Sequence, residues 1–155
     1  MERFLLINPR MEIRLGPAAA PEAPPPSPGA GPESGATVLV VDDDDAMRAV
    51  VAMALARAGL DTVQARDGLE ALALFQQHRE RIRLILMDLT MPNMDGEEAC
   101  RELRRLGAAV PVLLTSGFNE TEALHRFQGL GLAGFIQKPF GLGRLVEVVH
   151  KALSA

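Results

Sequence analysis

Short apolar runs alternate with amphipathic segments five times between Thr37 and the end of the chain. The apolar runs are typical of strands that are buried on both faces, as in a parallel sheet. The segments between them carry apolar residues at helical spacing and charges elsewhere. Because strands that alternate with helices form parallel βαβ units, we expect an α/β domain with a doubly wound parallel sheet. The expected strands are residues 37–41, 60–65, 84–87, 110–115 and 134–137, and the expected helices are about 44–58, 68–78, 97–106, 119–128 and 142–153.

Apolar side chains at helical spacing identify the helix faces that should pack on the sheet. We expect the following residues to face inward: Leu69, Leu72 and Phe75; Ala99, Cys100, Leu103 and Leu106; Ala123, Leu124 and Phe127; and Leu142, Leu145, Val146, Val149 and Leu153. The strand 60–65 has a mixed composition, which indicates a sheet edge.

The first 36 residues have a different composition. Residues 1–15 are a mixed segment that we do not assign, and residues 16–36 contain only Gly, Pro, Ala, Glu and Ser. Such a composition buries little apolar surface and favours extended, disordered chain. A proline-rich tract is also a possible ligand for adaptor domains, but this one lacks charged or aromatic anchors around the prolines. We therefore expect a linker up to residue 36 and one domain over residues 37–155.

The charge and the apolar runs exclude several classes of protein. A net charge of −4 does not suggest a nucleic-acid partner. The single cysteine, Cys100, excludes an internal disulfide framework and indicates a reducing compartment. The apolar run 4–7 is shorter than a signal-peptide core of roughly 7–15 residues or a membrane span of about 20. We expect a cytoplasmic protein that binds neither nucleic acid nor membrane.

Acidic residues follow two of the expected strands directly. Four aspartates occupy positions 42–45, and Asp88 follows the strand 84–87. Open α/β sheets bind their ligands at the carboxyl ends of the strands. Capping of the next helix accounts for Asp44 and Asp45, but crowded carboxylates repel one another unless a cation is present. Asp42, Asp43 and Asp88 therefore indicate a Mg²⁺ site at this edge of the sheet.

Asp88 is followed at once by a turn. Pro92 prevents the strand from continuing as a paired central strand. Residues 93–96, which end in Gly96, have the composition of a turn and precede a charged helix pattern. Taken alone, this stretch leaves two interpretations open, because an aspartate often merely ends a strand or caps a helix.

Hydroxyl and amino groups follow the last two strands. Thr115 and Ser116 place hydroxyl groups where a phosphoryl oxygen could bind. Lys138, which precedes Pro139, has the point charge that binds phosphate groups. Each of these residues has a common structural explanation, so only their combination is informative.

In combination, these elements resemble the receiver domain of two-component response regulators, and in particular receivers attached to hybrid kinases. The matching elements are Val40-Val41-Asp42-Asp43, Asp88 with Met91-Pro92-x-Met94-Asp95-Gly96, Thr115-Ser116-Gly117, and Phe135-x-x-Lys138-Pro139-Phe140. The resemblance extends from about Thr37 to the end of the chain. It implies a flavodoxin-like (βα)5 sheet with the strand order 2-1-3-4-5.

The resemblance also implies roles for the strand-end residues. Asp88 would be the phosphoacceptor, which takes a phosphoryl group from a histidine kinase or a histidine phosphotransfer protein. Mg²⁺ would be bound directly by Asp43, through water by Asp42, and by Asp88 and the backbone carbonyl of Thr90. The domain would be a regulatory phosphoacceptor whose only catalysis is its own phosphotransfer and autodephosphorylation.

Phosphorylation of such a domain acts as a switch in this resemblance. Thr115 and Lys138 would move toward the phosphoryl group, and Phe135 would turn inward behind Thr115. The surface formed by the fourth helix, the fifth strand and the fifth helix would change as a result. Ser116 would limit access to the phosphoryl group. Because no output domain follows the last helix in this sequence, we expect a stand-alone receiver or the terminal receiver of a hybrid kinase.

Three alternatives remain to be weighed. A haloacid-dehalogenase-type phosphatase also uses a strand-end aspartate with Mg²⁺, and Asp42-x-Asp44 resembles its first motif. Ala46 stands where that motif has Thr or Val, however, and Asp88 precedes Thr115, which is the wrong order. A receiver-like domain that binds partners without being phosphorylated is the second alternative. An EF-hand loop fails because its sixth position would be Met47 rather than glycine.

Overall fold

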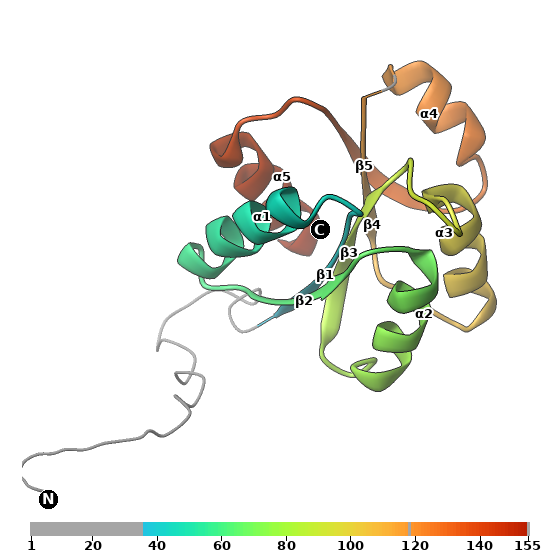
Figure 1. The fold of residues 1–155 in the computed structure, drawn as a ribbon, viewed down its shortest axis with the longest axis horizontal. Helices are drawn as coiled ribbons and strands as arrows, with labels where there is room; N and C mark the ends of the chain where they lie inside the picture. Colours follow the sequence, from blue (N-terminus) through green and yellow to red (C-terminus); the bar gives the residue numbers. More distant parts are fainter. Residues whose placement is uncertain (1–35, 118, 155) are drawn as a thin grey trace, which may run out of the picture.

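A computed structural model describes residues 36–117 and 119–154, in which strands and helices alternate along the chain (Figure 1). The elements are β1 (Thr37–Val41), α1 (Asp45–Arg57), β2 (Asp61–Ala65), α2 (Gly68–Gln77), β3 (Ile82–Asp88), α3 (Gly96–Arg105), β4 (Val112–Ser116), α4 (Glu120–Arg126), β5 (Leu132–Gln137) and α5 (Leu142–Ser154). The unassigned segment 1–15 and nearly all of the expected linker lie outside the described residues. Ala36, which was assigned to that linker, is buried, and its carbonyl accepts a hydrogen bond from the amide of Asp61 at 3.0 Å.

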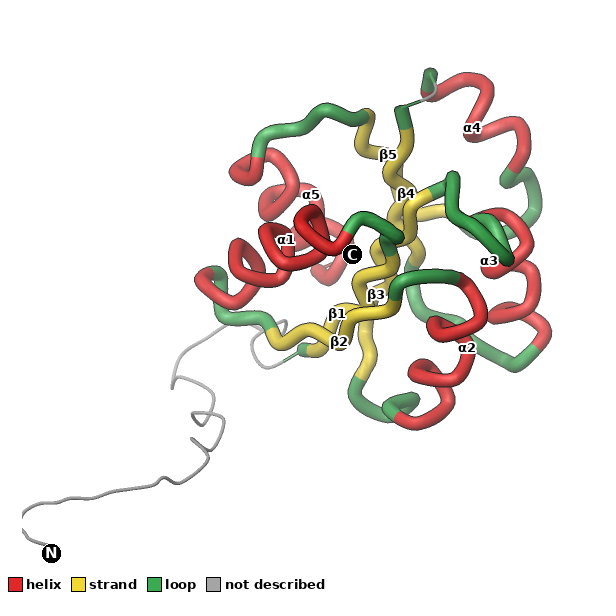
Figure 2. The backbone as a smooth tube through the Cα atoms, in the orientation of Figure 1, coloured by secondary structure: helices red, strands yellow, loops and turns green. Residues whose placement is uncertain are grey.

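The five strands form one parallel sheet in the order β2-β1-β3-β4-β5, which confirms the predicted topology. The helices α1 and α5 cover one face of the sheet, and α2, α3 and α4 cover the other (Figure 2). β2 lies at an edge, as its mixed composition indicated. Within the described residues, no helix is both long enough and apolar enough to span a bilayer.

The central strands supply side chains to both layers of the core. Because successive strand residues point to opposite faces, Ile85 and Met87 of β3 pack with the α2 and α3 layer, whereas Leu84 and Leu86 pack with the α1 and α5 layer. The same alternation occurs along β1. This double burial explains why β3 is a continuous apolar run rather than an alternating one.

Three leucines that helical spacing placed on inward faces are exposed: Leu69 at 55%, Leu124 at 40% and Leu142 at 40%. In α2 the buried face consists of Gly68, Ala71 and Phe75, so Leu69 lies one residue out of phase with it. In α4, Ala123 is buried and Leu124 is about 100° further around the helix. Leu142 is the first residue of α5, one turn before the buried Leu145.

Candidate functional site

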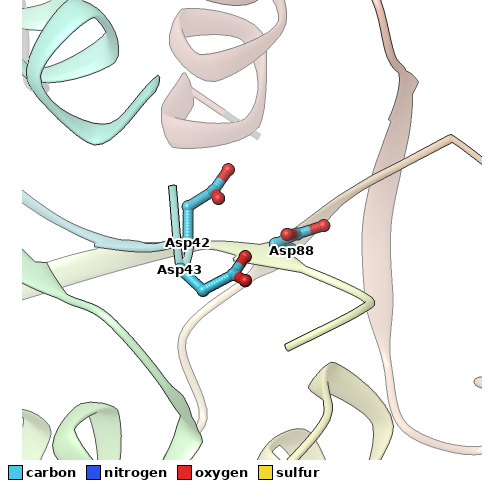
Figure 3. Close-up of side chains that lie close together, drawn as sticks. All are labelled: Asp42, Asp43 and Asp88. Atoms are coloured by element: carbon cyan, nitrogen blue, oxygen red, sulfur yellow. The ribbon is translucent and has the colours of Figure 1, made fainter. Parts of the chain in front are cut away.

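Three carboxylates converge at the carboxyl ends of β1 and β3. Asp42 and Asp43 follow β1, Asp88 ends β3, and one carboxylate oxygen of each lies within 4.8 Å of the other two (Figure 3). Asp42 and Asp88 are buried, whereas Asp43 is exposed and lies on the solvent side of the group. This set of oxygen donors, crowded and open to water on one side, fits Mg²⁺, which binds through a few carboxylates and retains waters.

The loop after β1 holds Asp42 in place. Its Oδ1 accepts a hydrogen bond from the amide of Asp44 at 2.9 Å, and its carbonyl accepts one from Nη1 of Arg48 at 2.8 Å. Asp44 caps α1 by accepting from the amide of Met47 at 3.1 Å, and Asp45 pairs with Arg48. The four-aspartate run therefore divides as expected, with the first two residues facing the site and the last two serving the helix.

Lys138 follows β5 and reaches into the acidic group. Its Nζ lies 3.0 Å from Oδ2 of Asp42 and 3.4 Å from Oδ2 of Asp88. Burial alone would lower the pKa of Lys138, but the hydrogen bond to Asp42 and the charge of Asp88 raise it above its ordinary value. Lys138 is therefore protonated at neutral pH and neutralises part of the negative charge at the site.

Asp88 lies in an environment that disfavours its ionised form. The pKa of its carboxyl is raised from 3.8 to about 6, first by burial and then by the charge of Asp42, while Lys138 opposes the rise. A carboxyl that is costly to ionise, with a fixed cation beside it, is typical of a reactive group rather than of a helix cap. Asp88 is still mostly ionised above pH 7, so the charged form is available for chemistry.

The raised pKa of Asp88 predicts how the stability of the metal-free protein depends on pH. Between pH 3.8 and about 6 the folded state holds this proton more tightly than the unfolded chain does. The free energy of unfolding should therefore fall as the pH rises through this window, and the cost of the charge should be complete above about pH 6. Urea unfolding in EDTA, compared with the Asp88→Asn variant, isolates this contribution. A difference between the two proteins that does not change with pH would contradict the prediction.

The last two strand ends lie beside Asp88. Thr115 of β4 is in register with Asp88, and the carbonyl of Thr115 accepts from the amide of Leu89 at 2.9 Å. Ser116 is buried, and its carbonyl accepts from the amide of Lys138 at 2.8 Å. Phe135 of β5 is half-buried beside β4. The predicted hydroxyl and amino residues are thus gathered at the same sheet edge as the aspartates.

The loop between β3 and α3 packs directly against the backbone of Asp88. Gly96 donates its amide to the carbonyl of Leu89 at 2.8 Å, and a Cβ at position 96 would lie 2.5 Å from the Asp88 carbonyl oxygen. Thr90 and Pro92 are exposed at the start of this loop. Pro139, in the corresponding loop after β5, follows a cis peptide bond.

Sequence reasoning missed two arginines near the site. Arg48 anchors the carbonyl of Asp42 from the first turns of α1, and Arg126 at the end of α4 contacts Asp95 and Glu97. The spacing of Arg48 from Asp45 is an i, i+3 pair that could have indicated a local contact. Arg126 lies 29 and 31 residues from its partners, so no local pattern reveals it.

Comparison with known proteins identifies the class of this site. Residues 38–150 match the response regulator receiver domain. The chain is 35% identical over 116 residues to the regulatory protein AtoC of Escherichia coli, covering 75% of this chain and 25% of that protein. It is 33% identical over 118 residues to the sensor kinase CckA of Brucella abortus, covering 76% of this chain and 12% of the kinase. The chain thus spans a quarter or less of the length of these two relatives.

Relatives that are matched over nearly their whole length belong to the same class of protein. The chemotaxis protein CheY of Bacillus subtilis is 30% identical over 118 residues, which cover 76% of this chain and 97% of that protein. The structure of Vibrio cholerae CheY4 superposes with a TM-score of 0.72 at 30% identity, covering 77% of this chain and 99% of the other. A receiver protein from Pseudomonas putida gives a TM-score of 0.69 at 34% identity, with coverage of 76% and 98%. This chain belongs to the receiver domain family of two-component response regulators.

Proposed function

We propose that Asp88 is the residue on which this receiver domain takes up its phosphoryl group, from the phosphohistidine of a histidine kinase or a histidine phosphotransfer protein. One observation carries the proposal: Asp88 is buried beside two further aspartates, with the Lys138 ammonium group 3.4 Å from its Oδ2. A structural cap would need neither the acidic neighbours nor the cation.

Mg²⁺ fits the donor set of this site. Asp42, Asp43 and Asp88 supply carboxylate oxygens, and we propose that the backbone carbonyl of Thr90 completes the protein ligands. The repulsion between Asp42 and Asp88, which helps to raise the pKa of Asp88, is the feature that a bound cation would relieve. When bound, Mg²⁺ supplies positive charge that stabilises the transferring phosphoryl group.

Two side chains of this chain then take part in the phosphoryl transfer, Asp88 as the nucleophile and Lys138 as the fixed positive charge. A carboxylate oxygen of Asp88 forms a bond to phosphorus while the bond between phosphorus and the donor imidazole breaks, and the electron pair of that bond leaves with the imidazole nitrogen. Lys138, which is held in its charged form, offsets the negative charge shared by the carboxylate and the phosphoryl oxygens. Hydrolysis of the resulting acyl phosphate by the domain itself would reset the site.

Thr115, Ser116 and Phe135 would report the phosphorylated state. Thr115 is the strand neighbour of Asp88, so a hydroxyl shift toward the phosphoryl group is a short movement. Phe135 lies on the adjacent strand and could occupy the space that Thr115 leaves. The surface of α4, β5 and α5 would change with them, because these elements follow β4 along the chain.

The cellular context is also part of the proposal. We infer a cytoplasmic domain over residues 37–155, since the single cysteine is buried and unpaired and the proposed phosphoacceptor site is of the kind that histidine kinases serve. The preceding residues would act as a linker to whatever the domain is attached to, and the similarity to CckA is compatible with a hybrid kinase.

Labelling with acetyl phosphate tests the proposed function. In the presence of Mg²⁺ the protein should gain the mass of one phosphoryl group, measured on the intact chain, and EDTA should prevent this gain. Acetyl phosphate bypasses the unidentified partner, so the result reports on the site alone. Failure to label under conditions that label a known receiver would instead favour an interaction domain that works without phosphorylation.

A further inference from the structure

The guanidinium group of Arg126 joins α4 to the start of α3. Its Nε lies 2.8 Å from Oε1 of Glu97, and its Nη2 lies 3.2 Å from Oδ2 of Asp95. The hydrogen bond to Glu97 raises the pKa of Arg126, and bonds from Arg101 and Arg126 lower the pKa of Glu97. Each of these two groups thus stabilises the charged form of the other.

The acidic end of the bridge is fixed to the backbone at Asp88. Asp95 caps α3 by accepting from the amide of Glu98 at 2.9 Å. The next residue, Gly96, is hydrogen-bonded to Leu89 and leaves no room for a Cβ against the Asp88 carbonyl. Asp95 therefore cannot move far unless the Asp88 backbone moves with it.

The basic end of the bridge is attached to a different part of the site. α4 is capped by Asn119, four residues after Thr115, so its position depends on the end of β4. The helix has seven residues, of which only Ala123 is buried. An open groove lined by Leu89, Asn119 and Glu122 runs between α4 and the Asp88 loop, and Arg126 borders it. α4 is attached to the core through Ala123 and its C-cap residue Phe127, and the Arg126 ion pairs join it to the start of α3.

We propose that Arg126 is a positioning residue that holds α4 in its unphosphorylated place, and that the bridge to Asp95 and Glu97 opposes phosphorylation of Asp88. This inference rests on the proposed function. In this proposal, a shift of Thr115 toward Asp88 separates Arg126 from its partners, because one end of the bridge follows Asp88 and the other follows Thr115. Coupling between two sites is reciprocal. If binding of a phosphoryl group weakens the bridge by a given factor, the bridge weakens binding of the phosphoryl group by the same factor.

Binding of beryllofluoride, a phosphoryl mimic, tests this coupling. In Arg126→Met, which retains an aliphatic stem but removes both ion pairs, the half-saturating beryllofluoride concentration in Mg²⁺ should fall by about 3- to 10-fold, as expected for two partly exposed pairs. Calorimetric titration measures this concentration. A residue with a merely structural role would weaken the binding or leave it unchanged when lost, so tighter binding is the distinguishing result.

Arg101→Met is the matched control. Arg101 also pairs with Glu97, at 3.0 Å, but it lies on α3 and does not reach α4. Its loss should change the beryllofluoride affinity by less than about twofold. As a second measurement, added salt should bring the half-saturating beryllofluoride concentrations of the wild type and Arg126→Met closer together, because salt screens the bridge while its effect on the ions themselves is common to both proteins.

The outcomes separate the two proposals. If the wild type binds beryllofluoride, and Arg126→Met binds it no more tightly and responds to salt in the same way, the positioning role of Arg126 is overturned while the phosphoacceptor proposal stands. If the wild type does not bind beryllofluoride at all, both are overturned. Should Arg126→Met unfold, Arg126→Gln takes its place in the titration, and binding no tighter than that of the wild type would overturn the role.

Discussion

Replacement of Asp88 by asparagine is expected to abolish labelling by acetyl phosphate. Asparagine has nearly the same shape as aspartate but lacks the carboxylate that we propose as the phosphoacceptor. The other buried carboxylate of the site, Asp42, is held by Lys138 and by the amide of Asp44, so it cannot readily replace Asp88. Intact-mass analysis after incubation with Mg²⁺ and acetyl phosphate measures the effect.

The same variant is expected to be more stable than the wild type without metal. The difference between 3.8 and about 6 in the pKa of Asp88 corresponds to at most about 3 kcal/mol at neutral pH, an upper limit because solvent screens the open side of the site. Removal of the charge should recover part of this free energy, measured by urea unfolding in EDTA. Loss of labelling with a gain in stability excludes unfolding as the cause.

Asp45→Asn is the matched control for this substitution. It makes the same chemical change three residues from Asp42, but Asp45 is exposed and pairs only with Arg48 on its own helix. Labelling of this variant should equal that of the wild type. Equal labelling of Asp88→Asn and the wild type would show that the acceptor is a different residue.

Introduction of a methyl group at Gly96 is expected to be the most destabilising small change in the domain. A Cβ there would lie 2.5 Å from the Asp88 carbonyl oxygen and 2.9 Å from the Leu89 Cα. Both atoms belong to the backbone, of Asp88 at the end of β3 and of Leu89 after it, so neither can rotate away as a side chain could. Gly96→Ala should reduce the free energy of unfolding by about 1–3 kcal/mol or more, and should slow labelling because Asp88 is displaced.

Gly143→Ala provides a control of opposite sign. Gly143 lies in α5, and a Cβ there would meet no atom within 4 Å. Alanine in a helix is more favourable than glycine by about 0.5–1 kcal/mol, so this variant should be slightly more stable than the wild type. Urea unfolding of both variants under the same conditions compares them. A Gly96→Ala variant as stable as the wild type would mean that the close approach is not as tight as described.

The positions of the strands and the gathering of the acidic residues were predictable because their signals are local, whereas the strand order came from the resemblance to receiver domains. Each strand is a continuous apolar run, and each polar site residue directly follows its strand, so the positions of the strands place the residues. Asp42, Asp43 and Asp88 therefore needed only the rule that parallel strands end at one edge. The wrong assignments of Leu69 and Leu124 arose where the phase of a helix depends on its packing, which spacing alone does not determine.

Contacts between distant segments were not predictable from local patterns. Arg104 donates to the carbonyls of Ala108 and Val110 in its own loop, but also to those of Leu130 and Gly131, which lie 26 and 27 residues away. In the sequence, Arg104 and Arg126 are basic residues on charged helices, where an exposed side chain is the ordinary expectation. Their partners come close only in the folded chain. Such residues carry no sequence signature, because the information lies in the partner segment.

The lack of space between Gly96 and the Asp88 carbonyl divides the domain into a stationary half and a responsive half. β3, the loop after it and the start of α3 share one closely packed backbone. On the proposed function, we therefore expect a phosphoryl group on Asp88 to act mainly across the sheet, on β4 and α4. Substitutions in the stationary half should alter how readily the domain is loaded, whereas substitutions in the responsive half should alter what a loaded domain communicates.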